Sequence, residues 1–163
     1  MILERLELID TVVSLRLASG EIECRSAIPL RSSIFDGHFP HHPIMPGVFM
    51  IEAMAQAAGF LFLAGKRAAQ MPFLIGVDRA RFRGFASPGD ILAIAAALRH
   101  ESSGFSVFGG SVRRGDQLLA ETEIRLAARD FPNEGMRRHL LERLAAIGAA
   151  PAPDQPAPRE AIA

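Results

Sequence analysis

One apolar segment in the middle of the chain restricts the possible folds more than any other feature. Residues 47–64 carry only two strongly polar side chains, Glu52 and Gln56. Pro46 and Gly47 suit the first turn of a helix, and Gly65 suits its end. An acid in mid-span is costly in lipid, and the segment is rich in Ala and Gly, so we reject a membrane span. We expect a helix about 27 Å long at the buried centre of a soluble protein.

Shorter segments on both sides of this helix have the pattern of β-strands. Turn signals such as Ser19-Gly20 and Gly115-Asp116 separate them. The predicted strands are residues 8–17, 21–30, 73–82, 91–99, 105–113 and 117–127. Short turns join the last three strands, which predicts an antiparallel meander. One long buried helix with several antiparallel strands predicts an α+β fold in which a curled sheet wraps around the helix.

The chain has 163 residues, and we expect one main domain over residues 1–130. Residues 131–147 contain a second, amphipathic helix, predicted from Glu134 to Ile147. Its apolar face consists of Met136, Leu140, Leu141 and Leu144. Residues 148–163 are rich in Ala and Pro, which predicts a disordered tail.

Charge and cysteine content exclude several classes of protein. Basic and acidic residues both count 18, so the net charge is zero, which argues against broad nucleic-acid binding and leaves little charge to oppose self-association. The one cysteine, Cys24, excludes a disulfide scaffold. The N-terminus lacks the pattern of a secretory signal, and we expect a cytoplasmic protein.

Three groups that suit acid–base chemistry lie close together in the sequence. Glu52 and Gln56 are four residues apart and share one helix face. A buried carboxyl group needs a partner or stays neutral, and a neutral carboxyl can act as a general acid. His38 lies in a proline-bounded loop, and imidazole is a common general base. The helix start at Gly47 offers free N–H groups for a negative oxygen. A hydrogen-bonded loop histidine and an acid paired with its neighbour remain the structural alternatives.

The same segment closely resembles the signature of a known enzyme family. The matching residues are Gly37-His38-Phe39-Pro40, Pro43-Ile44-Met45-Pro46-Gly47-Val48, Glu52-Ala53-Met54-Ala55-Gln56-Ala57, Gly76-Val77-Asp78-Arg79-Ala80-Arg81-Phe82 and Pro88-Gly89-Asp90. They resemble the 3-hydroxyacyl-[acyl-carrier-protein] dehydratases of bacterial type II fatty acid synthesis over about residues 8–126. The resemblance implies a hotdog fold and a double-hotdog homodimer, with three dimers often forming a hexamer.

The resemblance also implies a site in a tunnel between two subunits, with His38 from one and Glu52 from the other. His38 would take the C2 proton of a (3R)-3-hydroxyacyl thioester, and protonated Glu52 would donate to the departing hydroxyl. The Gly47 N–H would bind the thioester carbonyl oxygen, and Gln56 would orient Glu52. The family further implies a cis peptide between His38 and Phe39, and it needs no metal or organic cofactor.

Two further groups have both a functional and a structural interpretation. Arg79, Arg81 and Arg83 alternate, so a strand would place them on one side. They form either a solvated strand face or, as the family implies, a basic patch for acidic acyl carrier protein. A second group, consisting of Met50, Met54, Phe60 and Phe73, lines an acyl tunnel or simply packs the core.

Some features depart from the family or suggest other functions. His41 and His42 follow His38 closely, but no acid or cysteine completes a usual metal-ligand set, so we expect them at the loop or the tunnel rim. The short start, the Met71–Leu74 run and the C-terminal extension resemble a branch that makes very-long-chain acyl groups of lipid A. The alternative functions are a hotdog acyl thioesterase and a non-catalytic acyl-carrier-binding subunit.

Overall fold

The computed structural model describes residues 1–149 of the chain. Its elements follow one another in the order η1 (Leu3–Arg5), β1 (Thr11–Arg16), β2 (Glu21–Ala27), α1 (Ser33–Gly37), α2 (Gly47–Gly65), β3 (Met71–Phe82), β4 (Ile91–Glu101), β5 (Phe105–Arg114), β6 (Gln117–Arg129) and α3 (Glu134–Ala146). The six strands and the two long helices that the sequence predicts are all present. The short elements η1 and α1 lie in segments where the sequence predicts no helix.

The first two strands are shorter than predicted because their outer ends bond to other parts of the molecule. β1 begins late, since the N–H of Leu8 donates to the side-chain oxygen of Gln56 at 3.0 Å instead of to a strand. β2 ends early, and the chain turns into α1. Ser32 caps that helix by accepting a hydrogen bond from the N–H of Ile34 at 3.2 Å.

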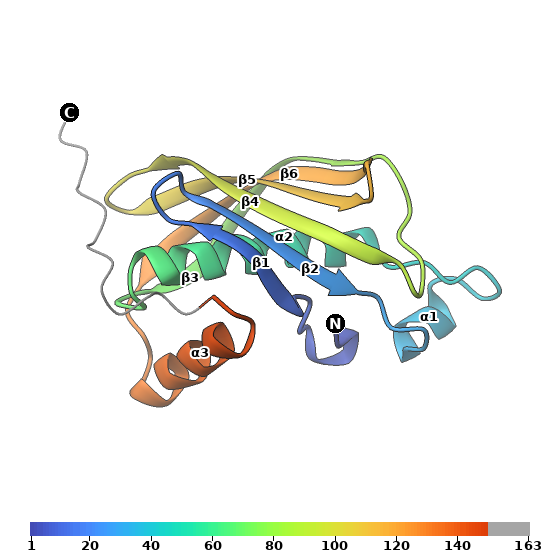
Figure 1. Cartoon of the computed structure of the whole chain (residues 1–163), viewed down its shortest axis with the longest axis horizontal. Helices are drawn as coiled ribbons and strands as arrows, with labels where there is room; N and C mark the ends of the chain where they lie inside the picture. Colours follow the sequence, from blue (N-terminus) through green and yellow to red (C-terminus); the bar gives the residue numbers. More distant parts are fainter. Residues whose placement is uncertain (150–163) are drawn as a thin grey trace.

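The six strands form one antiparallel sheet in the order β1-β2-β4-β5-β6-β3. The adjacent strands β4, β5 and β6 confirm the predicted meander. Figure 1 shows the sheet curling over α2, which runs along its inner side. This arrangement confirms the predicted α+β fold. The edge strands are β1 and β3, so one side of β3 has no partner strand within the described part of the chain.

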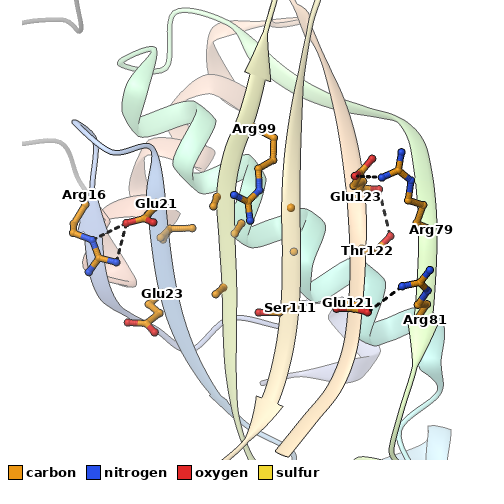
Figure 2. Close-up of a pocket in the computed structure, with 16 residues that line it drawn as sticks. Arg16, Glu21, Glu23, Arg79, Arg81, Arg99, Ser111, Glu121, Thr122 and Glu123 are labelled. Atoms are coloured by element: carbon orange, nitrogen blue, oxygen red, sulfur yellow. Dashed lines mark hydrogen bonds and ion pairs between the residues drawn. The ribbon is translucent and has the colours of Figure 1, made fainter. Parts of the chain in front are cut away.

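The outer face of the sheet, away from α2, carries charged side chains from several strands (Figure 2). Small residues form its floor, among them Ala95, Ala97 and Gly109. Arg16 and Glu21 form an ion pair at 3.0 Å across the first hairpin. Both side chains are largely exposed, and such surface pairs contribute only about 0–1 kcal/mol each. The outer face therefore favours solubility and charge balance more than stability.

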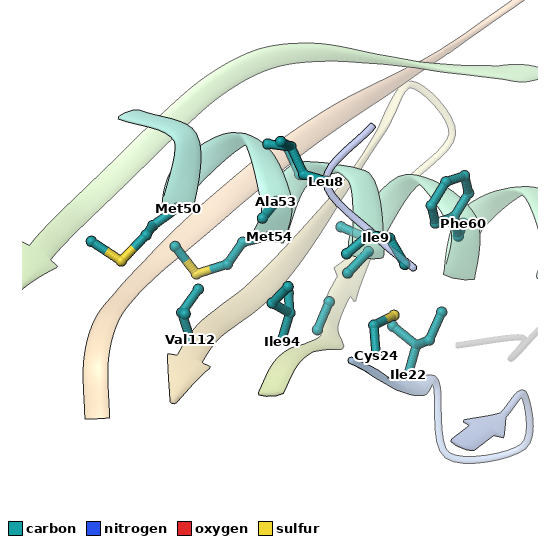
Figure 3. Close-up of a cluster of buried hydrophobic side chains, with 14 of the residues drawn as sticks. Leu8, Ile9, Ile22, Cys24, Met50, Ala53, Met54, Phe60, Ile94 and Val112 are labelled. Atoms are coloured by element: carbon teal, nitrogen blue, oxygen red, sulfur yellow. The ribbon is translucent and has the colours of Figure 1, made fainter. Parts of the chain in front are cut away.

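The inner face of the sheet packs on α2 and forms the hydrophobic core (Figure 3). Cys24, Ile94 and Val112 come from three strands, and all are at most 1% exposed. Gly110 lets β5 approach the helix closely, because a Cβ atom there would lie 2.9 Å from the Cβ of Met54. Burying each large apolar side chain contributes about 1.5–3 kcal/mol, so this layer holds the sheet around α2.

α2 is long and apolar enough to cross a membrane by length and composition, with a mean hydropathy of 1.6 in its most apolar window. In the structure 61% of that window is buried inside the protein. Strands β2 to β6 all contact the helix. The helix therefore occupies the centre of the fold, as the sequence predicts for a core helix.

α3 lies on the side of α2 away from strands β4 and β5 (Figure 1). The side chain of Asn133 caps it by accepting a hydrogen bond from the N–H of Met136 at 2.9 Å. After the helix, the carbonyl of Ile147 accepts a hydrogen bond from the N–H of Val12 at 2.7 Å, and Ala149 is fully buried. The chain is thus packed beyond the predicted tail boundary at residue 148. The rest of the predicted tail, residues 150–163, lies outside the described residues.

Candidate active site

His38 lies in a tight loop that the backbone closes locally. The N–H of Ile44 donates to the carbonyl of His38 at 3.0 Å, and Phe39 and His42 exchange two backbone hydrogen bonds. The peptide bond between His38 and Phe39 is cis, as the resemblance implies, and the two rings stack at 4.1 Å.

The His38 ring is oriented by a backbone carbonyl. Its Nδ1 lies 3.0 Å from the carbonyl oxygen of Ile44. A carbonyl can only accept a hydrogen bond, so Nδ1 carries the proton of the neutral ring. Nε2 is then left with a lone pair. This arrangement suits His38 to take a proton from a bound molecule.

A cavity of about 630 Å³ joins His38 to the start of α2. Its lining includes Gly47, Met50 and Arg83. Gly47 begins α2, and Phe82 packs so closely on it that an added Cβ would lie 2.9 Å from the ring. The first N–H groups of a helix lack partners within the helix, so this end can donate to a negatively charged oxygen. Imidazole and helix start thus share one cavity.

Glu52 is held by a chain of hydrogen bonds that begins far away in the sequence. Gln56 donates from Nε2 to Oε1 of Glu52 at 3.0 Å, so the predicted contact between these two side chains is present. Gln56 also donates to the carbonyl of Leu6 at 2.5 Å and accepts from the N–H of Leu8 at 3.0 Å. The N-terminal segment therefore fixes the amide that orients Glu52. The sequence carried no signal for this contact, because it joins residues about 50 positions apart.

A second cavity, of about 480 Å³, opens beside Glu52. Phe60 and Phe73, two of the four predicted tunnel residues, line this cavity, and its surface is mostly apolar. Met50 lies in the His38 cavity instead. Met54 lines neither of these two cavities of the described chain; it is fully buried under the sheet. The four predicted tunnel residues are thus divided between two cavities and the core.

His38 and Glu52 line different cavities of the single chain. The His38 cavity lies at the N-terminal end of α2, and the other cavity extends from Glu52 toward the C-terminal end of the helix. Each cavity holds one half of the acid–base pair expected from the sequence.

The three arginines of the predicted basic patch occupy two different environments. Arg79 pairs with Glu123 at 3.0 Å on the outer face (Figure 2). Arg81 and Arg83 both pair with Glu121, at 3.7 and 2.5 Å. The hydrogen bond from Arg83 is the main reason that the pKa of Glu121 lies below its usual value. Arg83 alone of the three also lines the His38 cavity. Both interpretations of the arginines, solvated face and docking patch, remain compatible with this arrangement.

His41, His42 and Cys24 line neither of the two cavities. His41 and His42 are exposed in the loop. Within residues 1–149 no three His, Cys, Asp or Glu side chains are grouped to hold a metal ion. Burial raises the pKa of the Cys24 thiol to about 12, so this cysteine is a poor nucleophile.

Comparison with known sequences identifies the family. The model of the FabA-like domain matches residues 2–123. A protein of Syntrophotalea carbinolica named 3-hydroxyacyl-[acyl-carrier-protein] dehydratase FabZ is 36% identical over 120 residues, covering 72% of this chain and 81% of that protein. A protein of the same name from Paracidovorax citrulli is 39% identical over 122 residues, covering 72% of this chain and 82% of its own length.

Solved structures share the fold at low sequence identity. The dehydratase heterocomplex ApeI:P from Xenorhabdus doucetiae contains a chain with a TM-score of 0.60 and 21% identity, covering 83% of this chain and 89% of that one. A mutant thioesterase from Staphylococcus aureus has a TM-score of 0.61 and 14% identity, covering 78% and 97%. These likenesses concern the fold alone, which is the hotdog fold expected above. The sequence matches establish that this chain belongs to the FabA-like family, among relatives named 3-hydroxyacyl-[acyl-carrier-protein] dehydratase.

Proposed function

We propose that the protein dehydrates (3R)-3-hydroxyacyl chains on acyl carrier protein to trans-2-enoyl chains during fatty acid elongation in the cytoplasm. The observation that carries the proposal is the His38 ring, whose Nδ1 is bonded to a backbone carbonyl beside a helix start. Its free Nε2 suits removal of a proton from carbon, and relatives at 34–39% identity are named for this dehydration.

The reaction needs one proton taken and one proton given. His38 takes the proton from C2, and the electron pair of that bond forms the C2–C3 double bond. The bond between C3 and its hydroxyl oxygen breaks, and Glu52 donates the proton with which that oxygen leaves as water. The thioester carbonyl gains negative charge meanwhile, and the Gly47 N–H at the start of α2 stabilises it. Proton exchange with water then restores His38 and Glu52.

A second copy of the chain completes the site. Within residues 1–149, one side of the edge strand β3 has no partner strand. This strand exposes apolar side chains, including Phe73, Leu74 and Ile75, that are 40–54% exposed. An exposed apolar edge of this length is a template for pairing with another strand. Pairing of two β3 strands gives a double-hotdog dimer in which Glu52 of the partner subunit faces His38. Three such dimers form the hexamer that the family resemblance suggests.

The acyl carrier protein docks beside the His38 cavity. Arg83 lines this cavity just beyond the end of β3, and Arg79 and Arg81 precede it within that edge strand. Basic side chains at a cavity mouth speed the encounter with an acidic partner. Arg83→Glu is expected to lower kcat/KM for carrier-bound substrate far more than for a small thioester mimic. Arg79→Glu serves as the matched change farther from the cavity, with a smaller effect; equal loss on both substrates in Arg83→Glu contradicts this docking site.

Turnover with carrier-bound substrates, followed by mass spectrometry, tests the activity. Wild type is expected to remove 18 Da, and His38→Ala and Glu52→Gln are each expected to lose about 100–10,000-fold in rate. Release of a free thiol instead of water would identify a thioesterase. Binding without turnover would identify a carrier-binding subunit. The preferred acyl length then distinguishes general elongation from synthesis of very long chains for lipid A.

Mixing the two inactive variants tests whether subunits share the site. A heterodimer of His38→Ala and Glu52→Gln has one complete site and one site that lacks both groups. Co-expression with two affinity tags isolates this heterodimer, which should recover about half the wild-type rate. The two homodimers, purified from the same cells, are the controls. A heterodimer as inactive as the controls would contradict a shared site.

A further inference from the structure

The C-terminal helix α3 lies outside the part of the chain that matches the family. The family match ends at residue 123, and α3 runs from Glu134 to Ala146. Nevertheless α3 lines the Glu52 cavity with three side chains on one face, Met136, His139 and Leu140. The spacing of these residues places them on neighbouring turns of the helix. This cavity wall therefore lies outside the part of the chain that the family model matches.

Hydrogen bonds at several points hold α3 in place. Near its start, Arg137 donates from Nε to the carbonyl of Ala68 at 2.9 Å, just beyond the end of α2. Near its end, Arg143 donates to the carbonyl of Ile9 at 2.6 Å. Leu144 is buried in the core. A helix fixed at both ends presents its cavity face as a firm wall rather than as a movable flap.

The wall lies at the far end of the cavity from the acid. From Glu52 the cavity follows α2 past Gly59 to Leu63, a distance of about 16 Å along the helix at 1.5 Å per residue. The contact between Arg137 and Ala68 places the first turns of α3 near that far end. An acyl chain whose reacting carbons lie at Glu52 and whose tail follows α2 reaches the α3 face only when the chain is long.

We propose that the Met136–Leu140 face of α3 forms the end wall of the acyl cavity and sets the longest acyl chain that the protein accepts. The proposal rests on the dehydration proposed above and identifies the part of the substrate that α3 contacts. The cavity surface is mostly apolar, and its volume of about 480 Å³ lies in the range of small-molecule sites, about 300–1,000 Å³. Met136 is 41% exposed, so its side chain can be replaced without opening the core.

Substitutions at Met136 test the wall through the dependence on acyl length. Met136→Trp places a larger side chain in the wall and should lower kcat/KM at least about tenfold for chains of twelve and sixteen carbons. The reason is that one methylene group more or less in an apolar pocket changes the ratio of kcat/KM between two substrates about 10–200-fold. The same variant should keep the four-carbon rate within about twofold. Met136→Ala should shift the preference toward longer chains. Arg138→Trp, on the exposed side of α3, is the matched control and should leave the length profile unchanged.

Binding measurements separate this proposal from the proposed function. Dissociation constants for saturated acyl-pantetheine amides of four to sixteen carbons can be measured without turnover. They therefore show how the α3 wall affects binding even if the wild-type protein has no dehydratase activity. A length-dependent loss of binding in Met136→Trp supports the proposal in either case. An unchanged length profile overturns it. An equal loss at all lengths together with a smaller mass by light scattering also overturns it, because Met136 would then lie in a subunit contact.

Discussion

The two halves of the candidate site are held in opposite ways. His38 is oriented by the carbonyl of Ile44, only six positions away, inside a loop that closes on itself. Glu52 is oriented by Gln56, which in turn is fixed by the backbone of Leu6 and Leu8. The His38 half is therefore a property of one short segment. The Glu52 half depends on the folding of the whole domain, because its supports come from the far end of the chain.

This difference predicts where each half is vulnerable. Side-chain changes around His38 leave its backbone partner in place, so they should be tolerated unless they alter the loop itself. Substitutions in the N-terminal segment should displace Gln56 and, through it, the side chain of Glu52. They should leave His38 in place. The predictions below test this contrast, beginning with the largest expected effect.

Gln56→Leu should have the largest effect, because it removes three hydrogen bonds at once. We expect kcat to fall about 100-fold, as a small misplacement of a reacting group can cause. The free energy of unfolding should fall by about 1–3 kcal/mol, since the Leu6 and Leu8 backbone groups lose their partner. Urea unfolding and steady-state kinetics measure the two effects.

The matched control for Gln56→Leu lies in the other half. Among the residues that the structure describes, His42 forms hydrogen bonds only through its backbone, within its own loop. His42→Ala should therefore keep both activity and stability near wild type. If His42→Ala were as damaging as Gln56→Leu, the contrast between a local half and a tertiary half would be wrong.

Gly47→Ala should cost about tenfold in kcat. The new Cβ would lie 2.9 Å from the Phe82 ring, so the ring or the helix start must move, and the N–H at residue 47 moves with it. Phe82 is 51% exposed, which leaves the ring room to shift and keeps the melting temperature nearly unchanged. The double variant Gly47→Ala with Phe82→Leu removes the clash and should recover most of the rate. If the rate does not recover, the contact with Phe82 is not the cause of the lower kcat.

Ser26→Ala should have a smaller effect on rate and a clear effect on stability. Ser26 is fully buried, donates to the carbonyl of Leu8 at 2.6 Å and accepts from the N–H of Asp10 at 3.1 Å. Loss of these bonds should cost about 1–3 kcal/mol. Because Leu8 holds Gln56, kcat should also fall a few-fold. A stability loss with an unchanged kcat would show that the N-terminal segment does not act on Glu52.

Cys24 should show the smallest effect, because it contacts neither half of the site. Burial raises its pKa from 9.0 to about 12, so the folded protein keeps the thiol protonated at pH 8. We expect iodoacetamide to label the native protein very slowly at pH 8 and the urea-unfolded chain quickly. The same shift makes the folded state lose stability as the pH rises from about 9 toward 12, where the unfolded thiol ionises first. Rapid labelling of the active protein would contradict this burial.

The architecture could be predicted because its patterns are local. The apolar residues 47–64 predicted the central helix, and alternating strands with Gly-containing turns predicted the meander. The predicted boundaries of β1 and β2 were wrong for a physical reason. The N–H of Leu8 bonds to a side chain of α2, and no local sequence pattern indicates this contact. The short helix α1 was not predicted, because its five residues are too few to show the spacing of apolar residues that indicates a helix.

The sequence by itself determined the chemical inventory of the site: an imidazole in a closed loop, a helix start, and an acid with an amide four residues away. Tertiary structure alone decided how these groups are arranged. It placed His38 and Glu52 in different cavities, attached Gln56 to the N-terminal segment, and brought Met136 of α3 to the Glu52 cavity. Hydrogen bonds and apolar contacts between distant segments follow from the packing of whole elements, and the order of residues along the chain does not encode them locally.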